Sequence, residues 1–360
     1  MVRFGVEEEF MVLDRRTLAP APRGMAARAA LHSEAVRTHQ ADAPVGGDSE
    51  AEFLDCQVEI STTPATTLAD AALELRGFRR ALGEFARGAD ALICSAGTPY
   101  GSPRSTAVTP KERYRVIADL MGGLTQEHFV NGLHVHTEVT GAEDRIRALN
   151  ALRPWLPVLL ALTANSPFWR HQPSGFASWR SILLRRLSTM WCPPLFADAD
   201  DYERRIDRLV ATGAAIDRGS IAWAARVSDN YPTVEVRVFD AQLTTEDSLF
   251  AAALTRALVT EPPTAIALES EAIDASFWMA ARAGMQARLV DPRTGEVAPA
   301  TSIAEGLVRA LRNSLDAHGD LEVVHARFGA IQAHGTGADI QLRALEEEGI
   351  AGLRRLFTAH

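Results

Sequence analysis

The sequence predicts an α+β fold in which helices pack outside a curved antiparallel sheet of about six strands. Residues 1–240 contain several short segments in which apolar and polar side chains alternate, the pattern of a half-buried strand. Residues 241–360 instead repeat apolar side chains at helical spacing. No internal repeat, low-complexity tract or flexible linker divides the chain. We therefore expect a single domain over residues 1–360, strand-rich at first and mostly helical from residue 241.

Composition narrows the class of protein. A chain of 360 residues can bury a large core, and its net charge of −9 argues against a general nucleic-acid binder. No apolar run reaches membrane-spanning length, and the first residues read as a strand without a signal-peptide pattern. Cys56, Cys94 and Cys192 are far apart, which is typical of reduced thiols. We expect a cytoplasmic protein that binds small molecules and neither nucleic acid nor membrane.

The first predicted strand, residues 2–13, contains three adjacent carboxylates. Because side chains alternate along a strand, Glu7 and Glu9 should face one side and Glu8 the other. Two carboxylates on one face of an apolar strand repel each other and are costly to desolvate, and a divalent cation would turn that cost into a binding site. The alternative is a solvated charge run at a strand end.

The second acidic segment is residues 52–60, after a stretch (15–43) that reads as loop followed by a short helix. Residues 52–60 alternate as one strand, with Glu59 on the polar face. Glu52 lies seven residues earlier, and an odd separation reverses sides. It therefore reaches the face of Glu59 only if a bend or bulge intervenes.

Helix and turn signals define the next elements. Thr67 opens a helix in capping-box fashion, with Asp70 at the third position and apolar residues following at helical spacing. Residues 92–96 read as a short apolar strand. A further helix begins at 109–112, with proline in its first turn, and ends at the glycines 122–123.

Two histidines mark the next strand, residues 131–139. The segment alternates strictly, which puts His134, His136 and Glu138 on one side and the apolar residues on the other. Imidazoles two apart on a strand suit ligation of one metal ion and its bound phosphate. A lone histidine on a strand is more often a core or surface residue whose hydrogen bonds are satisfied within the protein. Only the pair of histidines therefore indicates a metal site.

Residues 142–165 read as a helix bent by two prolines, and residues 200–217 as an amphipathic helix. Between them lies a segment rich in aromatic residues and arginine. Its members are Phe168, Trp169, Phe176 and Trp179, with Arg170 and Arg180. Such a segment resembles the wall of a small-molecule site, although core aromatics beside solvated arginines would give the same pattern.

The last strand pair lies within residues 220–240. Residues 221–226 form one strand, 229–232 a turn and 233–240 the second strand, in which Glu235 and Arg237 share the polar face. The two could be only a cross-strand ion pair. They are also what a metal–phosphate site needs, a carboxylate and a fork-shaped cation.

The remaining chain is predicted to be mostly helical, with a hairpin-like turn at 291–296. The expected helices are 241–268, 271–287, 302–317, 321–328 and 336–356.

Four predicted strands thus carry polar side chains opposite an apolar face. These are Glu7 and Glu9, Glu52 and Glu59, His134 and His136, and Glu235 and Arg237. So many carboxylates suggest two or three ions that hold a polyphosphate, and oxygen ligands favour Mg²⁺ or Mn²⁺.

Lys111, the only lysine, follows no glycine loop, so we expect neither a Walker A lysine nor a Schiff-base lysine in a pocket. A nucleotide would then lie in the mouth of the sheet.

Seven segments in this order resemble the carboxylate–amine ligase family of type 2 glutamate–cysteine ligases, relatives of glutamine synthetase. They are GVEEEF (5–10), E-x6-E-I (52–60), GLHVH (132–136), NSPFW (165–169), GFASWRS (175–181), PTVEVRVFD (232–240) and GTGAD (335–339). The resemblance implies a glutamine synthetase-like sheet that forms an active-site funnel. It also implies an ATP-dependent ligase that joins a small carboxylic acid to an amine, amino acids above all, through an acyl phosphate, and a homodimer or larger assembly.

The resemblance also implies roles for individual residues. Glu9, Glu52 and Glu59 would hold one Mg²⁺ ion, and Glu7, His134 and Glu235 another. His136 would contact a nucleotide phosphate, and Arg237 would steady the transferring phosphoryl group. Arg226 and Arg180 would bind phosphate or substrate carboxylates.

Departures from the family pattern lie outside this set. The chain reads Trp-Ala-Ala-Arg at 223–226 where the family has Trp-Asp-x-Arg, Ile340 replaces an arginine after GTGAD, and residues 170–171 read Arg-His where the family has Arg-Gly. The pattern fits a working ligase whose acid or amine partner need not be glutamate and cysteine. Two alternatives stay open: an ATP-dependent guanidino or carboxylate phosphotransferase, and a non-catalytic metal- or nucleotide-binding homologue.

Overall fold

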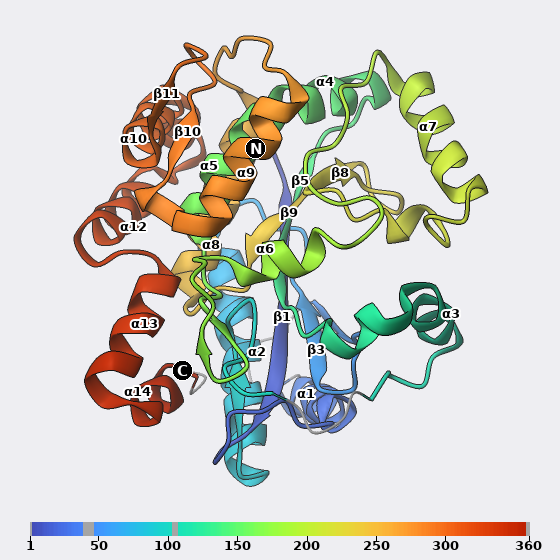
Figure 1. Ribbon diagram of the computed structural model, residues 1–360, viewed down its shortest axis with the longest axis vertical. Coiled ribbons are helices and arrows are strands. Elements are labelled where there is room, and N and C mark those ends of the chain that lie inside the picture. Colours follow the sequence, from blue (N-terminus) through green and yellow to red (C-terminus); the bar gives the residue numbers. More distant parts are fainter. Residues whose placement is uncertain (1, 39–46, 103–106, 358–360) are drawn as a thin grey trace.

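An antiparallel sheet forms the centre of the computed structural model, which describes residues 2–38, 47–102 and 107–357 (Figure 1). The strand order is β2-β3-β1-β5-β9-β8, and β4 also pairs with β1. The strands are β1 (Phe4–Asp14), β2 (Asp48–Ala51), β3 (Gln57–Ser61), β4 (Ala91–Cys94), β5 (Gly132–Glu138), β8 (Ala225–Val227) and β9 (Thr233–Asp240). The predicted α+β class with an antiparallel sheet is confirmed, with seven strands in this sheet within the described residues.

Strand β1 is the central element because it pairs with β3, β4 and β5. Its even-numbered residues from Phe4 to Val12 are buried, whereas Glu7 and Glu9 are only partly buried. The predicted division of the acidic triplet is therefore confirmed. Glu7 and Glu9 share one face, and Glu8 lies on the opposite, helix-covered face.

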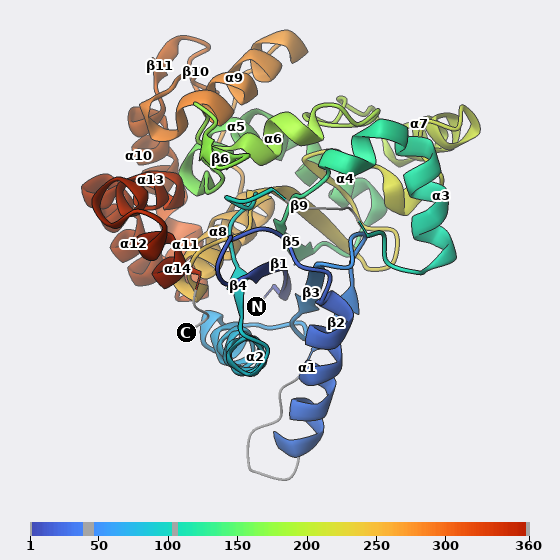
Figure 2. The same ribbon diagram turned by 60° about the horizontal axis from the view of Figure 1, so that its bottom comes forward.

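Helices α2 (Leu68–Gly88) and α8 (Thr245–Thr260) lie close to each other and cover the buried face of β1 (Figure 2). The Thr67 side chain accepts a hydrogen bond from the Asp70 amide, as the capping pattern predicts. Helix α8 is buried along most of its length, which agrees with its nearly continuous apolar sequence. The predicted bent helix is α4 (Ala142–Leu152), a 3₁₀ turn (Arg153–Trp155) and α5 (Leu156–Thr163).

Shorter elements surround the other face of the sheet. These are α3 (Glu112–Met121), a 3₁₀ turn η1 (Gly122–Glu127), the hairpin β6 (Phe168–Trp169) and β7 (Gln172–Pro173), α6 (Trp179–Leu184), α7 (Ala199–Ala211) and a 3₁₀ turn (Arg218–Ser220). No residue of α3 is buried. Helix α1 (Gly24–Thr38) accounts for the short helix expected within 15–43, of which residues 39–43 lie outside the described residues.

The C-terminal third is mostly helical, as predicted, and includes one small hairpin. Its elements are α9 (Ser270–Ala283), a 3₁₀ turn (Gly284–Gln286), β10 (Arg288–Val290), β11 (Val297–Pro299), α10 (Ala300–Ala310), α11 (Arg312–His318), α12 (Leu321–His334), α13 (Gly337–Glu348) and α14 (Ile350–Leu356). No helix within the described part of the chain is both long and apolar enough to cross a membrane. The single-domain organisation stays a prediction.

Several predicted boundaries are wrong. The expected strand 52–60 is divided. Strand β2 ends before it, at Ala51, a turn follows, and β3 begins only at Gln57, so that β2 and β3 form a hairpin. The expected helix 241–268 ends at Thr260, because two prolines follow at 262–263. The expected helix 336–356 is divided at Gly349, whose φ of +63° ends α13.

Two further boundaries are also wrong. The helix expected over 200–217 stops at Ala211 and is followed by Gly213, which has a positive φ. The strand expected over 221–226 begins only at Ala225, because the residues before it pair instead with the chain around Trp191.

Candidate active site

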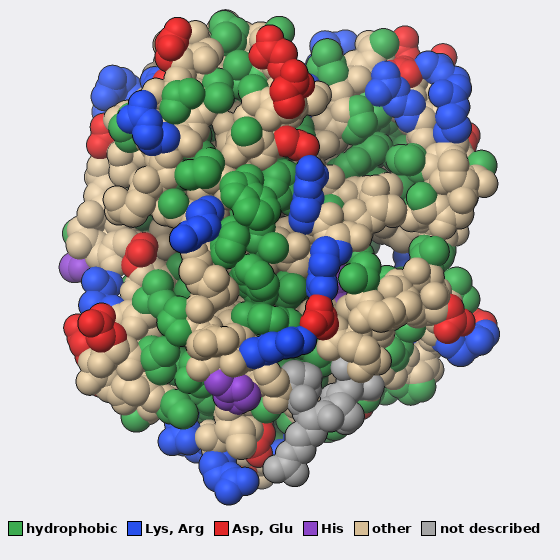
Figure 3. Space-filling model, in the orientation of Figure 1, with side chains coloured by type: hydrophobic (Ala, Val, Ile, Leu, Met, Phe, Trp, Pro, Cys, Tyr) green, Lys and Arg blue, Asp and Glu red, His purple; other side chains and the backbone are tan. Residues whose placement is uncertain are grey.

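A cavity of about 730 Å³ opens on the face of the sheet that carries Glu7 and Glu9. Its floor consists of polar side chains from β1, β3, β5, β8 and β9, and its walls come from α3, α6 and residues 214–231. In Figure 3 the surface is hollowed between α3 and the segment near α7, on the right of the view.

Strand register explains why polar residues that are distant in the sequence meet on this floor. Glu9 pairs with Glu59 across β1 and β3, and Glu7 pairs with His134 across β1 and β5. His136 pairs with Glu235 across β5 and β9, and Glu235 with Arg226 across β9 and β8. Directly opposed residues share a face of the sheet, so these side chains form one polar row across it.

Two groups on the floor place three ligand atoms within 4.8 Å of one another. They are Glu7 with His136 and Glu235, and Glu7 with Glu59 and His134. His134 Nδ1 is 3.1 Å from Glu7 Oε2, and His136 Nε2 is 3.3 Å from Glu7 Oε1. The resemblance implies a group of Glu7, His134 and Glu235. In the structure it is His136 that joins Glu7 and Glu235, whereas His134 joins Glu7 and Glu59.

Glu52 reaches the cavity through the turn between β2 and β3, which supplies the required bend. The Phe53 amide donates to its Oε2 at 2.8 Å. Burial, and then the negative charge of Glu9, raises the pKa of Glu52 to about 7. Burial and the neighbouring carboxylates, first that of Glu7, also raise the pKa of Glu59 well above its usual range. The cluster therefore holds more negative charge than the surrounding protein neutralises.

Other members of the row are matched with positive charge. Burial raises the pKa of Glu7, but the imidazoles of His134 and His136, whose ring nitrogens lie 3.1 and 3.3 Å from its oxygens, outweigh this effect and lower that pKa well below its usual range. Burial likewise raises the pKa of Glu235, and the charges of Arg237 and Arg226 reverse the effect and lower the pKa. Burial lowers the pKa of His134, whereas for His136 the nearby carboxylates of Glu7 and Glu235 overcome burial and raise the pKa.

The three predicted arginines differ in how fully they are engaged. Arg226 donates to Glu235 Oε2 at 2.7 Å and to the carbonyls of residues 219 and 221, so most of its donors are occupied. Arg237 contacts Glu235 from within its own strand. Arg180 is 4% exposed, yet its Nε has no hydrogen-bond partner among the described residues. Asp240 Oδ1 lies 4.0 Å from Arg180 Nη1, behind the cavity.

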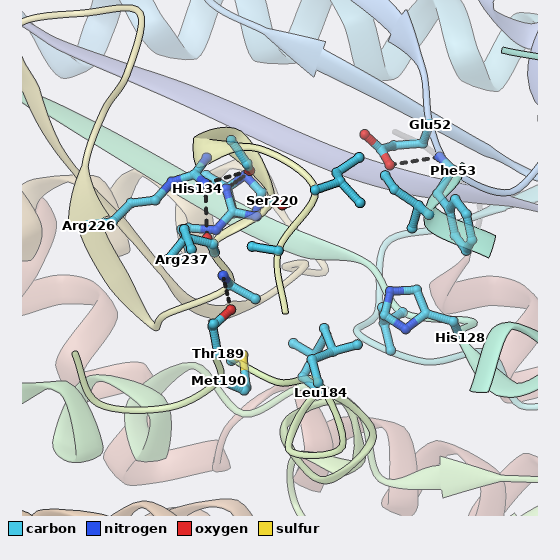
Figure 4. A pocket seen from close by; sticks show the side chains of 18 of the residues that line it. Glu52, Phe53, His128, His134, Leu184, Thr189, Met190, Ser220, Arg226 and Arg237 are labelled. Atoms are coloured by element: carbon cyan, nitrogen blue, oxygen red, sulfur yellow. Dashed lines mark hydrogen bonds between the residues drawn. The ribbon is translucent and has the colours of Figure 1, made fainter. Parts of the chain in front are cut away.

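Several cavity residues were missed by the sequence reasoning. Figure 4 shows His134, Arg226 and Arg237 on one side of the cavity, Glu52, Phe53 and His128 on the other, and Leu184 and Met190 along the α6 side. Burial lowers the pKa of the His128 imidazole to about 4, so the ring is neutral near pH 7. No pattern marked His128, because it lies in an irregular segment between η1 and β5.

Two other basic residues lie in contrasting places. Lys111, which follows no glycine loop, lines the cavity, where its Nζ donates to the Ala51 carbonyl at 3.1 Å. Arg170 is not among the residues that line the cavity and pairs with Glu127 at the surface, which agrees with the alternative of a solvated arginine. Arg180 is the arginine from that segment that lines the cavity.

The donor set fits divalent cations such as Mg²⁺ or Mn²⁺. His136 Nε2 is buried and accepts or donates no hydrogen bond among the described residues, although it lies 3.3 Å from Glu7 and 4.0 Å from Glu235. A buried polar atom without a partner is unfavourable, and a cation between these groups would satisfy it. The raised pKa values of Glu52 and Glu59 fit the same account, since a cation would stabilise their ionised forms.

Solved structures share this fold at low sequence identity. The glutamate–cysteine ligase from Francisella tularensis in complex with AMP aligns with a TM-score of 0.71 and 12% identity, over 99% of this chain and 87% of that one. A bifunctional glutathione synthetase from Pasteurella multocida aligns with a TM-score of 0.69 and 15% identity, over 99% of this chain and 51% of that one.

Sequence comparisons place the chain in a family. It is 38% identical over 347 residues to "Putative glutamate–cysteine ligase 2-1" of Nocardia farcinica, across 94% of this chain and 88% of the relative. It is also 35% identical over 353 residues to "Putative glutamate–cysteine ligase 2-2" of Saccharopolyspora erythraea, and that alignment covers 95% of this chain and 88% of the relative. The protein is thus an enzyme of the ligase class that forms C–N bonds by joining a carboxylate to an amine. The match to glutamate–cysteine ligase family 2 covers residues 3–359, so the chain belongs to that family.

Proposed function

We propose that this ligase uses ATP and Mg²⁺ to activate a carboxylic acid as an acyl phosphate and then forms an amide with an amine. One observation carries the proposal. Acidic and imidazole side chains from four strands, with Arg180 and Arg237, line a single cavity large enough for several small molecules. The family match supports the overall reaction class, and the side chains in the cavity support activation by ATP through an acyl phosphate.

The carboxylates and histidines would hold the cations. Glu9, Glu52 and Glu59 would hold one ion, and Glu7 and Glu235 a second, with His134 or His136 completing it. Bound Mg²⁺ (or Mn²⁺) would neutralise phosphate charge and orient the polyphosphate for transfer.

Arginine side chains would supply the remaining positive charge. A substrate carboxylate oxygen attacks the γ-phosphorus of ATP, the bond to the β-phosphate oxygen breaks, and ADP leaves. Arg237, held by Glu235, would pair with the transferring phosphoryl group, which gathers negative charge on its outer oxygens. Arg180 has donors to spare and would bind phosphate or a substrate carboxylate. His136 would contact phosphate or cation through Nε2.

The second half-reaction needs an amine beside the acyl group. The neutral amine attacks the carbonyl carbon, the bond from that carbon to the phosphate oxygen breaks, and one N–H proton passes to the departing phosphate or to water, which leaves the amide. Apolar side chains of α3 and α6, with Phe53, line the cavity away from the carboxylates and would contact the apolar parts of the ligands. Glutamate and cysteine are the first candidates, because the relatives carry those names. The Ala224 and Ile340 departures leave other amino acids as candidates.

We also propose a cytoplasmic enzyme that forms a homodimer or larger assembly and binds neither membrane nor nucleic acid. The free cysteines Cys56, Cys94 and Cys192 support a reducing compartment.

Hydroxylamine trapping tests the proposed route. The protein would be incubated with ATP, Mg²⁺, hydroxylamine and a panel of amino acids and dicarboxylic acids, with ADP and hydroxamate measured together. We expect both products from at least one acid, and neither from Glu59→Gln. ADP without hydroxamate would favour a phosphotransferase, and no ADP with any acid would favour a non-catalytic nucleotide-binding protein.

A further inference from the structure

The middle carboxylate of the acidic triplet makes a buried contact behind the cavity. Glu8 is 2% exposed and lies between Glu7 and Glu9 on the opposite face of β1. Arg79 of α2 donates to both of its oxygens, from Nε to Oε2 at 3.0 Å and from Nη2 to Oε1 at 2.7 Å. Ser248 of α8 also donates to Oε1. The carboxylate is therefore fully paired within the helical layer.

The same guanidinium reaches the chain beyond β9. Its Nη1 donates to the Leu243 carbonyl and its Nη2 to the Gln242 carbonyl, both at 2.9 Å. The Gln242 side chain donates in turn to the carbonyl of Asp240, the last residue of β9. Strand β5 lies between β1 and β9 in the sheet. Arg79 therefore joins β1 to the segment that directly follows β9, although β1 and β9 are not neighbours in the sheet.

The separation of these two strands matters for the cavity. Glu7 of β1 and Glu235 of β9 lie on either side of His136 of β5, and their ligand atoms lie within 4.8 Å of one another. Backbone hydrogen bonds fix each strand only to its neighbour, so small errors in spacing add across β5. A contact from β1 to the segment that directly follows β9 would limit how far these two strands, and the carboxylates on them, can separate.

We propose that Glu8 and Arg79 are positioning residues, which hold β1 and the end of β9 at the spacing needed for a divalent cation bound by Glu7, His136 and Glu235. The inference rests on the proposed function, because it assumes that this group binds a cation. Stability alone does not account for the pair, since well-packed apolar residues often replace a buried ion pair without loss of stability.

Mn²⁺ binding provides a test that does not depend on turnover. Free Mn²⁺ would be followed by electron paramagnetic resonance for wild type, the double variant Glu8→Leu/Arg79→Met, and Arg79→Lys. The matched control is Arg256→Met/Asp320→Leu. That pair is buried and forms two hydrogen bonds at 2.6 and 2.7 Å, and although Arg256 lies over the ring of Phe4 at the start of β1, neither residue belongs to β1. Circular dichroism would report folding, and ADP release would report kcat and the Mg²⁺ requirement.

We expect Mn²⁺ affinity at one class of site to fall about 10- to 100-fold in the Glu8/Arg79 double variant, as for other outer partners of metal ligands. The control should bind like wild type. If the double variant does not fold, Arg79→Lys decides, because lysine keeps the charge but cannot make the forked contact. Wild-type affinity in a folded Glu8/Arg79 variant, or an equal loss in the control, would overturn this inference. A wild-type protein that binds no Mn²⁺ would overturn the proposed function itself.

Discussion

Replacing Glu52 with glutamine should stabilise the protein in the absence of divalent cations while impairing its activity. Burial and the charge of Glu9 raise the pKa of Glu52 from 4.5 to about 7. Between these two values the folded state keeps a proton that the unfolded state releases. The free energy of unfolding therefore falls as pH rises, by about 1.4 kcal/mol per pH unit. This loss reaches about 3 kcal/mol by pH 7 and is absent below pH 4.5.

Glutamine carries no titrating proton in either state, so the variant lacks this loss. Its side-chain oxygen can still accept the hydrogen bond from the Phe53 amide. Urea denaturation in EDTA would give the free energy of unfolding of wild type and Glu52→Gln at both pH values. Relative to wild type, the variant should gain up to about 3 kcal/mol between pH 4.5 and pH 7, and it should be the more stable protein at pH 7. Mg²⁺ should narrow or reverse this difference, because it stabilises the ionised carboxylate only in wild type.

A nearby variant provides the control. Glu50 is exposed and lies two residues before Glu52, 3.7 Å from Lys111, so Glu50→Gln should follow wild type at every pH. A difference between wild type and Glu52→Gln that does not change between pH 4.5 and pH 7 would refute the reasoning. It would mean that Glu52 is solvated and does not belong to a crowded carboxylate cluster.

The remaining predictions concern other parts of the cavity and the core. Glu9→Gln and Glu59→Gln should each abolish ATP turnover, and undiminished ADP release in either would remove that residue from the site. Arg237→Lys should lower kcat about 10²- to 10³-fold, because lysine cannot donate in a fork, and a near-normal kcat would reduce Arg237 to an ion-pair role. Asp240→Asn, which weakens the support behind Arg180, should raise the KM of one anionic substrate about tenfold while leaving kcat nearly unchanged, and unchanged KM values would contradict this role. Trp155→Ala should cost about 3–5 kcal/mol of unfolding free energy, because Trp155 is fully buried, without altering KM; a smaller cost in urea denaturation would show that the core repacks.

Strand periodicity was sufficient to predict most of the floor of the cavity. Because alternate residues share a face, the sequence alone predicted that Glu7 and Glu9 face away from Glu8, and that His134 and His136 project together. It could not predict which strands are neighbours. That information lies in the register, which pairs Glu7 with His134 and His136 with Glu235.

Residues outside the strands were harder to predict. Glu52 could be placed only after the turn between β2 and β3 was known, because one added or lost residue reverses the face. His128 and Lys111 reach the cavity because α3 and η1 fold over it, and local sequence does not encode that arrangement. Arg170 and Arg180 carry similar local signals, yet tertiary packing turns one outward and buries the other.

The crowded carboxylates in this cavity lower the stability of the cation-free protein, and they favour the binding of cations. The raised pKa values of Glu52 and Glu59 mean that, without cations, these carboxyl groups keep their protons to higher pH than they would in water. Cation binding would release those protons, so the affinity for Mg²⁺ should rise with pH up to about pH 7, the pKa of Glu52. Functional sites often carry strain of this kind, which the rest of the fold offsets.

Transfer of labelled oxygen tests the central claim most directly. An acid substrate with ¹⁸O in its reacting carboxyl group would be converted to amide with ATP, Mg²⁺ and the amine, and the released phosphate analysed by mass spectrometry. Attack of that carboxylate on the γ-phosphate predicts one ¹⁸O atom in each phosphate, because the carboxyl oxygen leaves with it. Amide formed together with unlabelled phosphate would contradict an acyl phosphate made in this cavity.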